Sequence, residues 1–209
     1  MEMILDLYQY DYDPEFPVVC FDECSRQILK DVRKPLPMRP GDILRHDYEY
    51  EREGVANLFV MVEPLTGWRR VNVTEHRKYQ DFAKELQYLA DVQYPDATRI
   101  FLVVDNLNIH SFTSLWVTFK ASEALRLSRR FEFIYTPKHA SWLNMAEIEI
   151  SALHTQCLRK RFDSRDHMAR EVEAWQDKRN KRAVSITWQF TPDVAREKMA
   201  RHYPDNLID

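Results

Sequence analysis

An uninterrupted apolar run, Ile-Phe-Leu-Val-Val at residues 100–104, is followed at once by Asp105 and Asn106. A continuous run of this kind is typical of a strand that is buried on both faces of its sheet. Such a strand belongs in a sheet that is flanked by helices, so the run predicts an α/β fold. The two polar residues mark the end of the strand, where α/β sheets place their ligand crevices.

The rest of the chain provides the other strands and helices of this sheet. Strands are predicted at residues 18–24, 56–63, 67–73 and 131–135, and helices at 79–90, 111–130, 144–159 and 165–182. Pro64 to Gly67 reads as a tight hairpin turn, and Thr74 as the cap of the helix at 79–90. Three antiparallel strands, a helix, a strand, a helix, a strand and further helices indicate a sheet of mixed direction. Residues 1–16 are predicted to be a short N-terminal segment and linker, ahead of one domain at 17–209.

Composition excludes several classes of protein. With 209 residues, 44% of them hydrophobic, the chain can bury one substantial core. Its longest apolar stretches fall far short of the roughly 20 residues that span a bilayer, and its first residues lack the basic start of a signal peptide. We therefore expect a cytoplasmic protein without a membrane partner. Cys20, Cys24 and Cys157 are expected to be free thiols.

Three acidic residues stand at structured positions. Asp22 lies in the first predicted strand, Asp105 follows the run at 100–104, and Glu147 opens a predicted helix. If the fold brings these carboxylates together, their mutual repulsion is tolerable mainly when a divalent cation neutralises it. Mg²⁺ or Mn²⁺, which prefer oxygen ligands, are the expected ions.

Each of the three also has a structural explanation. Asp22 can be an acid at a strand end, and Asp105-Asn106 is ordinary turn chemistry. Asn144 and Glu147 have the spacing of a helix cap and its reaching acid. Because neighbours on a strand point to opposite faces, Asp22 and Glu23 cannot both face one site.

Together the three acids support one chemistry. Two cations held by shared carboxylates can activate a water or a 3′-hydroxyl for in-line attack on a phosphodiester. The chain has only three glycines and no glycine-rich phosphate loop, and no Cys/His spacing indicates zinc. His110, Asn106 and Asn144 are candidates for the shell around the ligands. His110 could orient a ligand, contact the scissile phosphate or be an ordinary histidine at a helix start.

The net charge of −3 gives no global argument for nucleic-acid binding, but the charge is unevenly spread. Residues 159–182 contain nine basic and five acidic side chains. Such a segment can contact a phosphate backbone or be a solvated helix face. The candidate DNA contacts are Arg26, Lys30, Arg33, Lys34, Lys138, His139, Arg159, Lys160 and Arg161.

Several segments resemble the catalytic segments of bacterial insertion-sequence transposases of the mariner-like DDE superfamily. The resemblance rests on Val18–Glu23, Val104–His110 and Tyr135–Glu147, and extends to Leu36–Gly41, Tyr48–Tyr50, Ala56–Phe59, Glu63–Trp68 and Trp188–Thr191. It implies an RNase H-like fold of the retroviral-integrase type, with Asp22 on the first strand, Asp105 at the end of the fourth and Glu147 on the following helix as catalytic metal ligands. It also implies cut-and-paste DNA transposition with two Mg²⁺ or Mn²⁺ ions, by a homodimer on double-stranded DNA near the bacterial nucleoid.

The chain departs from the family pattern at its N-terminus. Full-length members carry a helix-turn-helix region that recognises terminal inverted repeats, and no such region fits before Asp22. Two alternatives therefore stay open beside a transposase catalytic domain: a stand-alone metal-dependent nuclease, and a non-catalytic dimerising or inhibitory transposase fragment.

Overall fold

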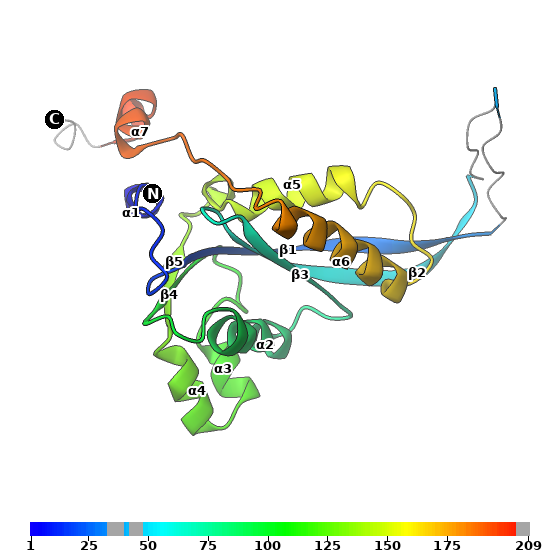
Figure 1. The fold of residues 1–209 in the computed structure, drawn as a ribbon, viewed down its shortest axis with the longest axis horizontal. Coiled ribbons are helices and arrows are strands. Elements are labelled where there is room, and N and C mark those ends of the chain that lie inside the picture. The colour runs from blue at the N-terminus through cyan, green and yellow to red at the C-terminus, as the bar shows by residue number, and fades with distance from the viewer. Residues whose placement is uncertain (33–39, 42–47, 204–209) are drawn as a thin grey trace.

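A mixed five-stranded sheet in the order β3-β2-β1-β4-β5 lies at the centre of the chain (Figure 1). The structure is a computed structural model, and it describes residues 1–32, 40–41 and 48–203. The first three strands pair antiparallel, β4 runs parallel to β1, and β5 runs parallel to β4. The strands are β1 (Val18–Asp31), β2 (Tyr50–Glu63), β3 (Trp68–Thr74), β4 (Ile100–Val104) and β5 (Phe131–Tyr135). The predicted element order and the mixed direction are confirmed.

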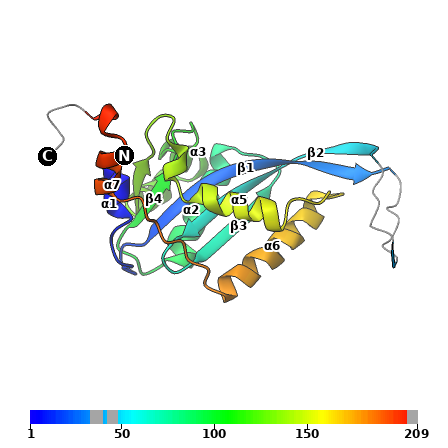
Figure 2. The ribbon, with the colours of Figure 1, turned by 90° about the horizontal axis from the view of Figure 1, so that it is seen from above.

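Helices cover both faces of the sheet (Figures 1 and 2). One face carries α2 (Tyr79–Tyr88), which continues into the π-helix η1 (Leu89–Gln93), with α3 (Thr113–Thr118) and α4 (Ala121–Ser128). The other face carries α5 (Ala146–Gln156) and α6 (Arg165–Lys181), which lie side by side in both views. The remaining helices are α1 (Glu2–Leu7), η2 (Ser141–Leu143), α7 (Pro192–Lys198) and η3 (Ala200–His202).

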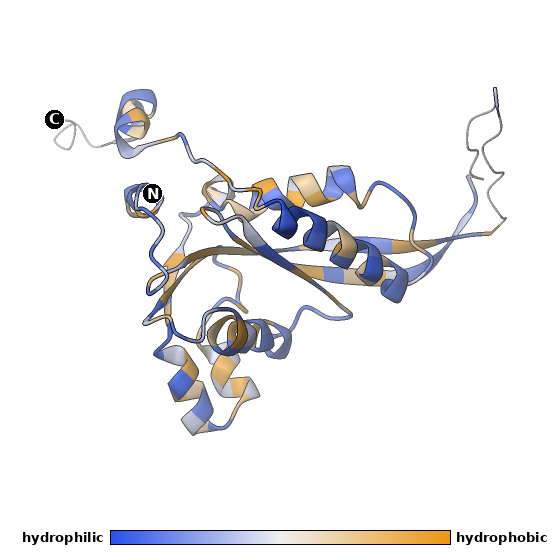
Figure 3. Cartoon of the chain, viewed as in Figure 1, coloured by the Kyte–Doolittle hydropathy of each residue, from blue (hydrophilic) through white to orange (hydrophobic). Residues whose placement is uncertain are grey.

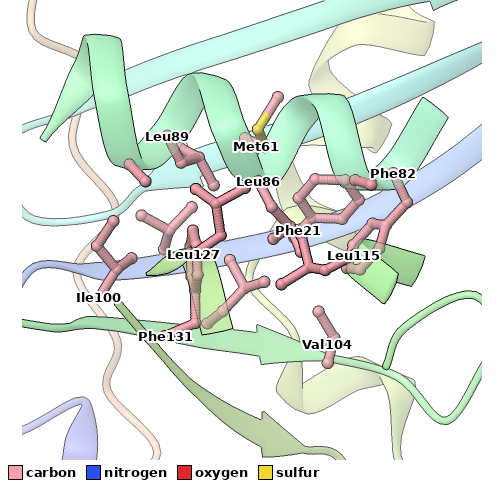
Figure 4. Packing of buried hydrophobic residues seen from close by; sticks show 14 of the residues in the cluster. Phe21, Met61, Phe82, Leu86, Leu89, Ile100, Val104, Leu115, Leu127 and Phe131 are labelled. Atoms are coloured by element: carbon pink, nitrogen blue, oxygen red, sulfur yellow. The ribbon is translucent and has the colours of Figure 1, made fainter. Parts of the chain in front are cut away.

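The largest hydrophobic cluster fills the space between the sheet and α2 (Figure 4). Phe82 and Leu86 lie one helical turn apart on α2 and are fully buried. The ring of Phe82 meets Phe21 of β1 edge-on, with the ring centroids 5.0 Å apart. Burial of each such side chain contributes about 1.5–3 kcal/mol. This packing fixes α2 against the centre of the sheet.

The fourth strand is buried on both faces, as its apolar run predicts. Leu102 and Val104 belong to the cluster under α2, whereas Val103 packs on the opposite face with Cys20 and Val62. Figure 3 shows α6 as largely hydrophilic. β4 therefore holds a fixed position between two packed layers.

Side chains of α6 protect β3, the edge strand of the sheet. The Asn180 side chain accepts a hydrogen bond from Arg69 N at 2.9 Å and donates one to Arg69 O at 2.8 Å, which imitates a further strand. The Gln176 side chain accepts from Val71 N at 2.7 Å. An edge with satisfied backbone groups is a poor template for another chain.

A buried ion network joins β3, α5 and α6. Arg69 Nε lies 2.7 Å from Glu149 Oε1, and both side chains have no exposed surface. Arg179 of α6 donates to both oxygens of Glu149, at 2.8 and 3.0 Å. Two guanidinium groups thus neutralise one buried carboxylate, and α5 is tied to the sheet.

Several element boundaries differ from the predicted ones. β1 and β2 extend beyond residues 24 and 56 as a long two-stranded ribbon, since backbone pairing continues through polar residues such as Arg26 and Lys30. Thr74 ends β3 and does not cap α2; Lys78 precedes that helix, and the Asp81 carboxylate accepts from its N–H at 3.0 Å. The predicted helix at 111–130 is two helices, and α5 is shorter than predicted at both ends.

The N-terminal helix α1 packs at the end of the sheet opposite the ribbon (Figure 1). Ile4 and Leu5 are buried in the same cluster as Cys20 and Val103. Tyr8 OH donates to Leu143 O at 2.8 Å, just before α5. No helix in the described parts of the chain is long and apolar enough to cross a membrane.

Glu149→Ala is expected to lower the free energy of unfolding by about 3–5 kcal/mol, because it leaves the buried Arg69 charge uncompensated. Urea denaturation measures this change. Glu147→Ala, two positions earlier on the same helix and exposed, is the matched control and should change stability by less than about 0.5 kcal/mol. Equal losses for the two variants would contradict the assignment of Glu149 as the structural acid of α5.

Candidate active site

Asp22 and Asp105 are brought to adjacent positions by the pairing of β1 with β4. The parallel register aligns Val18 with Phe101 and Cys20 with Val103. The same register continued by two residues places Asp22 beside Asp105, just beyond the last paired residue of β4. Sequence analysis placed Asp22 near the end of its strand, but β1 continues past it and pairs Asp22 with Val60 of β2.

The Asp22 carboxylate is buried, and no cationic side chain within residues 1–32, 40–41 and 48–203 pairs with it. The residue is 8% exposed, Oδ1 accepts from Glu23 N at 2.8 Å, and Oδ2 lies 3.5 Å from the Asn144 amide. Desolvation raises the pKa of Asp22 to about 7 against the effect of the Glu23 N–H, and the carboxylates of Glu147, Glu23 and Asp105 raise it further. A group in this situation gains most from a bound cation.

The Asp105 carboxylate lies in the opposite electrostatic situation. Its side chain is 38% exposed, and Oδ1 accepts from Leu107 N at 3.0 Å and from His110 Nδ1 at 2.6 Å. The hydrogen bond from His110 lowers the pKa of Asp105, although burial opposes the shift. Two neighbouring carboxyl groups thus have pKa values displaced in opposite directions, which is a frequent property of catalytic sites.

His110 lies behind Asp105, inside the protein. Its side chain has no exposed surface, and Nε2 is 2.7 Å from Glu23 Oε1, whose side chain is 1% exposed. Burial alone lowers the pKa of His110, but the hydrogen bonds to Asp105 and Glu23 outweigh burial and raise the pKa to about 9. The ring also packs against Phe21 and Phe82, with centroid distances of 5.8 and 4.9 Å.

Glu147 approaches Asp22 from the first turn of α5. The residue is exposed, and its charge contributes to the raised pKa of Asp22. It lines a groove of about 270 Å³ between α5 and β1, whose walls are Cys24, Ser25, Arg26, Glu147, Ile150, Ser151, His154 and Leu158. Glu147 therefore borders a groove together with Ser151 and His154 of the same helix.

Asn144 connects the start of α5 to β1. Its amide donates to Phe21 O at 2.8 Å, and its Oδ1 accepts from Ala146 N at 3.2 Å. Glu147 N donates to Asn144 O at 3.1 Å, whereas the helix itself starts after Met145. Asn144 therefore fixes Glu147 relative to Asp22, in addition to capping part of the helix.

A second groove, of about 280 Å³, includes Asp105 in its lining. It is lined by Asp105, Asn106, Leu107, Thr136, Pro137, Lys138, His139 and Ser141. The Asn106 amide donates to Thr136 O at 2.6 Å and so joins the loops that follow β4 and β5. Lys138 and His139 are exposed, and His139 has a positive φ of 64°.

Asp22 lies beside Asp105, and the charge of Glu147 acts on Asp22, but the three acids do not form a complete coordination shell. Within the described ranges, no three His, Cys, Asp or Glu side chains are arranged to hold one metal ion. The donor chemistry nevertheless fits a hard divalent cation, because the available atoms are carboxylate oxygens and Asp22 is buried without a positive partner.

The other predicted DNA contacts are distributed along the β1–β2 ribbon and the segment after α5. Arg26 donates to Leu158 O at 2.8 Å beside the Glu147 groove, and Lys30 lies 3.8 Å from Glu53. Lys160 pairs with Glu171, Arg161 lies 2.6 Å from Asp31, and Arg159 is exposed. Arg33 and Lys34 lie outside the described residues.

Sequence analysis did not include Glu23 among the site residues. The expectation that Asp22 and Glu23 point to opposite faces agrees with their surroundings, since Glu23 reaches His110 on the α2 side. The available signal was its position: Glu23 alternates with Val19 and Phe21 on a face that is otherwise core, where a carboxylate needs a partner.

The mixed sheet has helices on both faces, with acids on β1, after β4 and on α5, which follows β5. This architecture is RNase H-like. A family model described as DDE superfamily endonuclease matches residues 17–169, and the chain belongs to this family. A comparison with curated proteins gives no match.

Three solved structures of Mos1 are similar in fold. The Mos1 transposase paired-end complex with left transposon end and the Mos1 strand transfer complex each have a TM-score of 0.56 and 16% identity, covering 88% of this chain and 55% of theirs. A pre-cleavage Mos1 transpososome has a TM-score of 0.50 and 15% identity, covering 88% and 59%. This chain thus spans a little more than half the length of these proteins.

Asp22→Asn should stabilise the metal-free protein more at pH 8 than at pH 5. The pKa of Asp22 is about 7 in the folded protein and about 3.9 in the unfolded chain, so the folded state binds more protons between these values and wild-type stability falls as pH rises through the window. The difference between variant and wild type should grow by on the order of 1–3 kcal/mol between these pH values. Urea unfolding in a chelator measures it. A difference independent of pH would contradict the raised pKa.

Proposed function

We propose that the chain is the catalytic domain of a cut-and-paste DNA transposase, which cleaves DNA strands and joins a 3′-hydroxyl to a target. The observation that carries this proposal is the β1–β4 register, which continued by two residues places Asp22 beside Asp105, together with the charge of Glu147, which helps to raise the pKa of Asp22. Family membership and the similarity in fold to the Mos1 complexes support it.

Asp22, Asp105 and Glu147 are the proposed ligands of divalent metal, with Mg²⁺ or Mn²⁺ as the ion and two ions as the expected number. Asp105 Oδ1 is already engaged by Leu107 and His110, so Oδ2 is the atom left to bind metal. When bound, the ions would activate the attacking water or hydroxyl and neutralise the charge that develops on the leaving oxygen. Glu147 lies closest to solvent and would complete the shell from α5.

Asn144 and Asn106 support this arrangement as neighbours of the ligands. Asn144 sets the distance between α5 and β1 through Phe21 O, and Asn106 holds the loop after Asp105 against Thr136. Because neither side chain is free to turn without losing a hydrogen bond, both would keep the ligand positions fixed while DNA enters.

The two grooves beside the acids are the proposed path of the DNA strand. Lys138 and His139 line the groove on the Asp105 side, and Arg26 and His154 line the groove on the Glu147 side. A strand that crosses from one groove to the other would place a phosphodiester over the carboxylates. Of the remaining basic candidates, Arg159 is exposed, whereas Lys160 and Arg161 are held in ion pairs.

Double-stranded DNA is the proposed partner, at the transposon ends and at the target. Because two ends must be handled together, we expect the assembled form to be a homodimer on DNA, acting in the cytoplasm of the host cell.

Asp105→Asn should reduce strand cleavage and strand transfer by at least about 100-fold, since losing a metal ligand costs more than losing a neighbour of one. The assay uses duplexes that carry the ends of the encoding element, a target duplex and Mg²⁺ or Mn²⁺. Glu132→Gln is the matched control, because Glu132 is a surface acid on β5 that pairs with Arg99. Supplying a pre-cleaved end separates the functions: a transposase joins it to target DNA, a simple nuclease does not. Wild-type rates in Asp105→Asn would refute the metal assignment.

Lys138→Ala and Arg26→Ala should each weaken DNA binding and reduce the slope of log K against log salt by about one unit, because each removes one phosphate contact. Fluorescence anisotropy of a labelled duplex at several salt concentrations gives the slope. Lys84→Ala on α2, on the opposite face of the sheet from α5, is the control. Unchanged slopes in both variants would show that Lys138 and Arg26 do not contact DNA phosphates.

A further inference from the structure

Glu23 and His110 form a buried pair directly behind Asp105. We propose that Glu23 is a positioning residue of the active site, which acts through His110 to fix which oxygen of Asp105 faces the metal. This inference rests on the proposed function, because it concerns a residue that holds one of the proposed ligands. Asp22 and Glu23, which point to opposite faces of β1, would then both serve the same site: Asp22 as a metal ligand and Glu23 as a positioning residue.

The contacts form an unbroken chain from Glu23 to Asp105. Glu23 Oε1 lies 2.7 Å from His110 Nε2, and His110 Nδ1 lies 2.6 Å from Asp105 Oδ1. Leu107 N donates to the same Oδ1 at 3.0 Å. With two donors on Oδ1, the carboxylate is held in one rotational position and Oδ2 is directed away from the buried pair.

The imidazole ring is itself held from several sides. Phe21 and Phe82 contact it, with centroid distances of 5.8 and 4.9 Å. The backbone of His110 is fixed because Tyr135 OH donates to its carbonyl at 2.7 Å. Asp105 binds Nδ1 of the ring and Glu23 binds Nε2. The contact with Glu23 therefore fixes the rotation of the ring about its Cβ–Cγ bond.

Stability alone is a weak reason for this pair. The Glu23 side chain is 1% exposed and lies opposite Phe59 of the hydrophobic cluster, where an apolar residue would avoid the cost of burying a carboxylate. Replacing buried ion pairs by well-packed apolar residues is often neutral or stabilising. Partners of this kind behind metal ligands orient them, and their loss typically costs 10–100-fold in metal affinity or activity.

Mn²⁺ titration calorimetry with and without a DNA duplex, together with thermal unfolding, tests the inference. Glu23→Ala should weaken Mn²⁺ binding by about 10–100-fold. Glu23→Gln keeps an acceptor for His110 and should stay within about threefold of wild type. His110→Asn keeps a donor near the Nδ1 position and should bind Mn²⁺ better than His110→Gln, which keeps only the reach towards Glu23.

Glu85→Gln is the matched control, because Glu85 is a buried glutamate on α2 that pairs with Arg70 and does not contact His110. It should lower the melting temperature and leave Mn²⁺ affinity unchanged. Wild-type Mn²⁺ affinity in Glu23→Ala, while Asp105→Asn loses binding, would overturn the positioning role and leave the proposed function standing. Wild-type protein that binds no Mn²⁺ with or without DNA would overturn both. If Glu23→Ala does not fold, Glu23→Leu, which fills the same space without an acceptor for His110, replaces it, and wild-type Mn²⁺ affinity in that variant would overturn the positioning role.

Discussion

The parallel pairing of β1 with β4 is the constraint on which the rest of the structure depends. The pairing places Asp105 beside Asp22, and it is secured because β4 is buried in two clusters at once. A shift by one residue would turn every side chain of β4 to the wrong face, so the cores on both sides hold the register. Burial of apolar side chains on both faces of β4 thus offsets the repulsion between the carboxylates of Asp22 and Asp105.

Two of the buried acidic residues, Glu149 and Asp22, differ in how their charge is balanced. Glu149 is neutralised by Arg69 and Arg179 and ties α5 to the sheet. Among the described residues, Asp22 accepts hydrogen bonds from neutral groups, and other carboxylates surround it. Glu149, whose charge is neutralised, supports the fold. Asp22, whose charge is not neutralised, is the residue at which a bound divalent cation would supply the positive charge and bind the phosphodiester. Residues two positions apart on α5, Glu147 and Glu149, would serve one of these two roles each.

Sequence reasoning succeeded where a signal was local. β4 and β5 have the predicted bounds, because continuous apolar runs end at polar residues. The ribbon of β1 and β2 was underestimated, since its outer part alternates charged residues such as Lys30 and owes its strand form to pairing with a distant segment. Asp105 directly follows β4 and Glu147 lies in the first turn of α5, as predicted, whereas Asp22 lies within β1 and not near its end. Glu23 escaped notice because its partner, His110, is 87 positions away and only the folded sheet brings them together.

The most direct measurement is anomalous diffraction from crystals soaked in MnCl₂. The account predicts a manganese peak at the edge of the sheet between the Asp22 and Asp105 carboxylates, on the side of Asp105 Oδ2, with Glu147 turned towards it. Manganese bound elsewhere on the protein, with no peak at this edge even in crystals grown with DNA, would contradict the central claim that the β1–β4 pairing builds a metal-dependent active site.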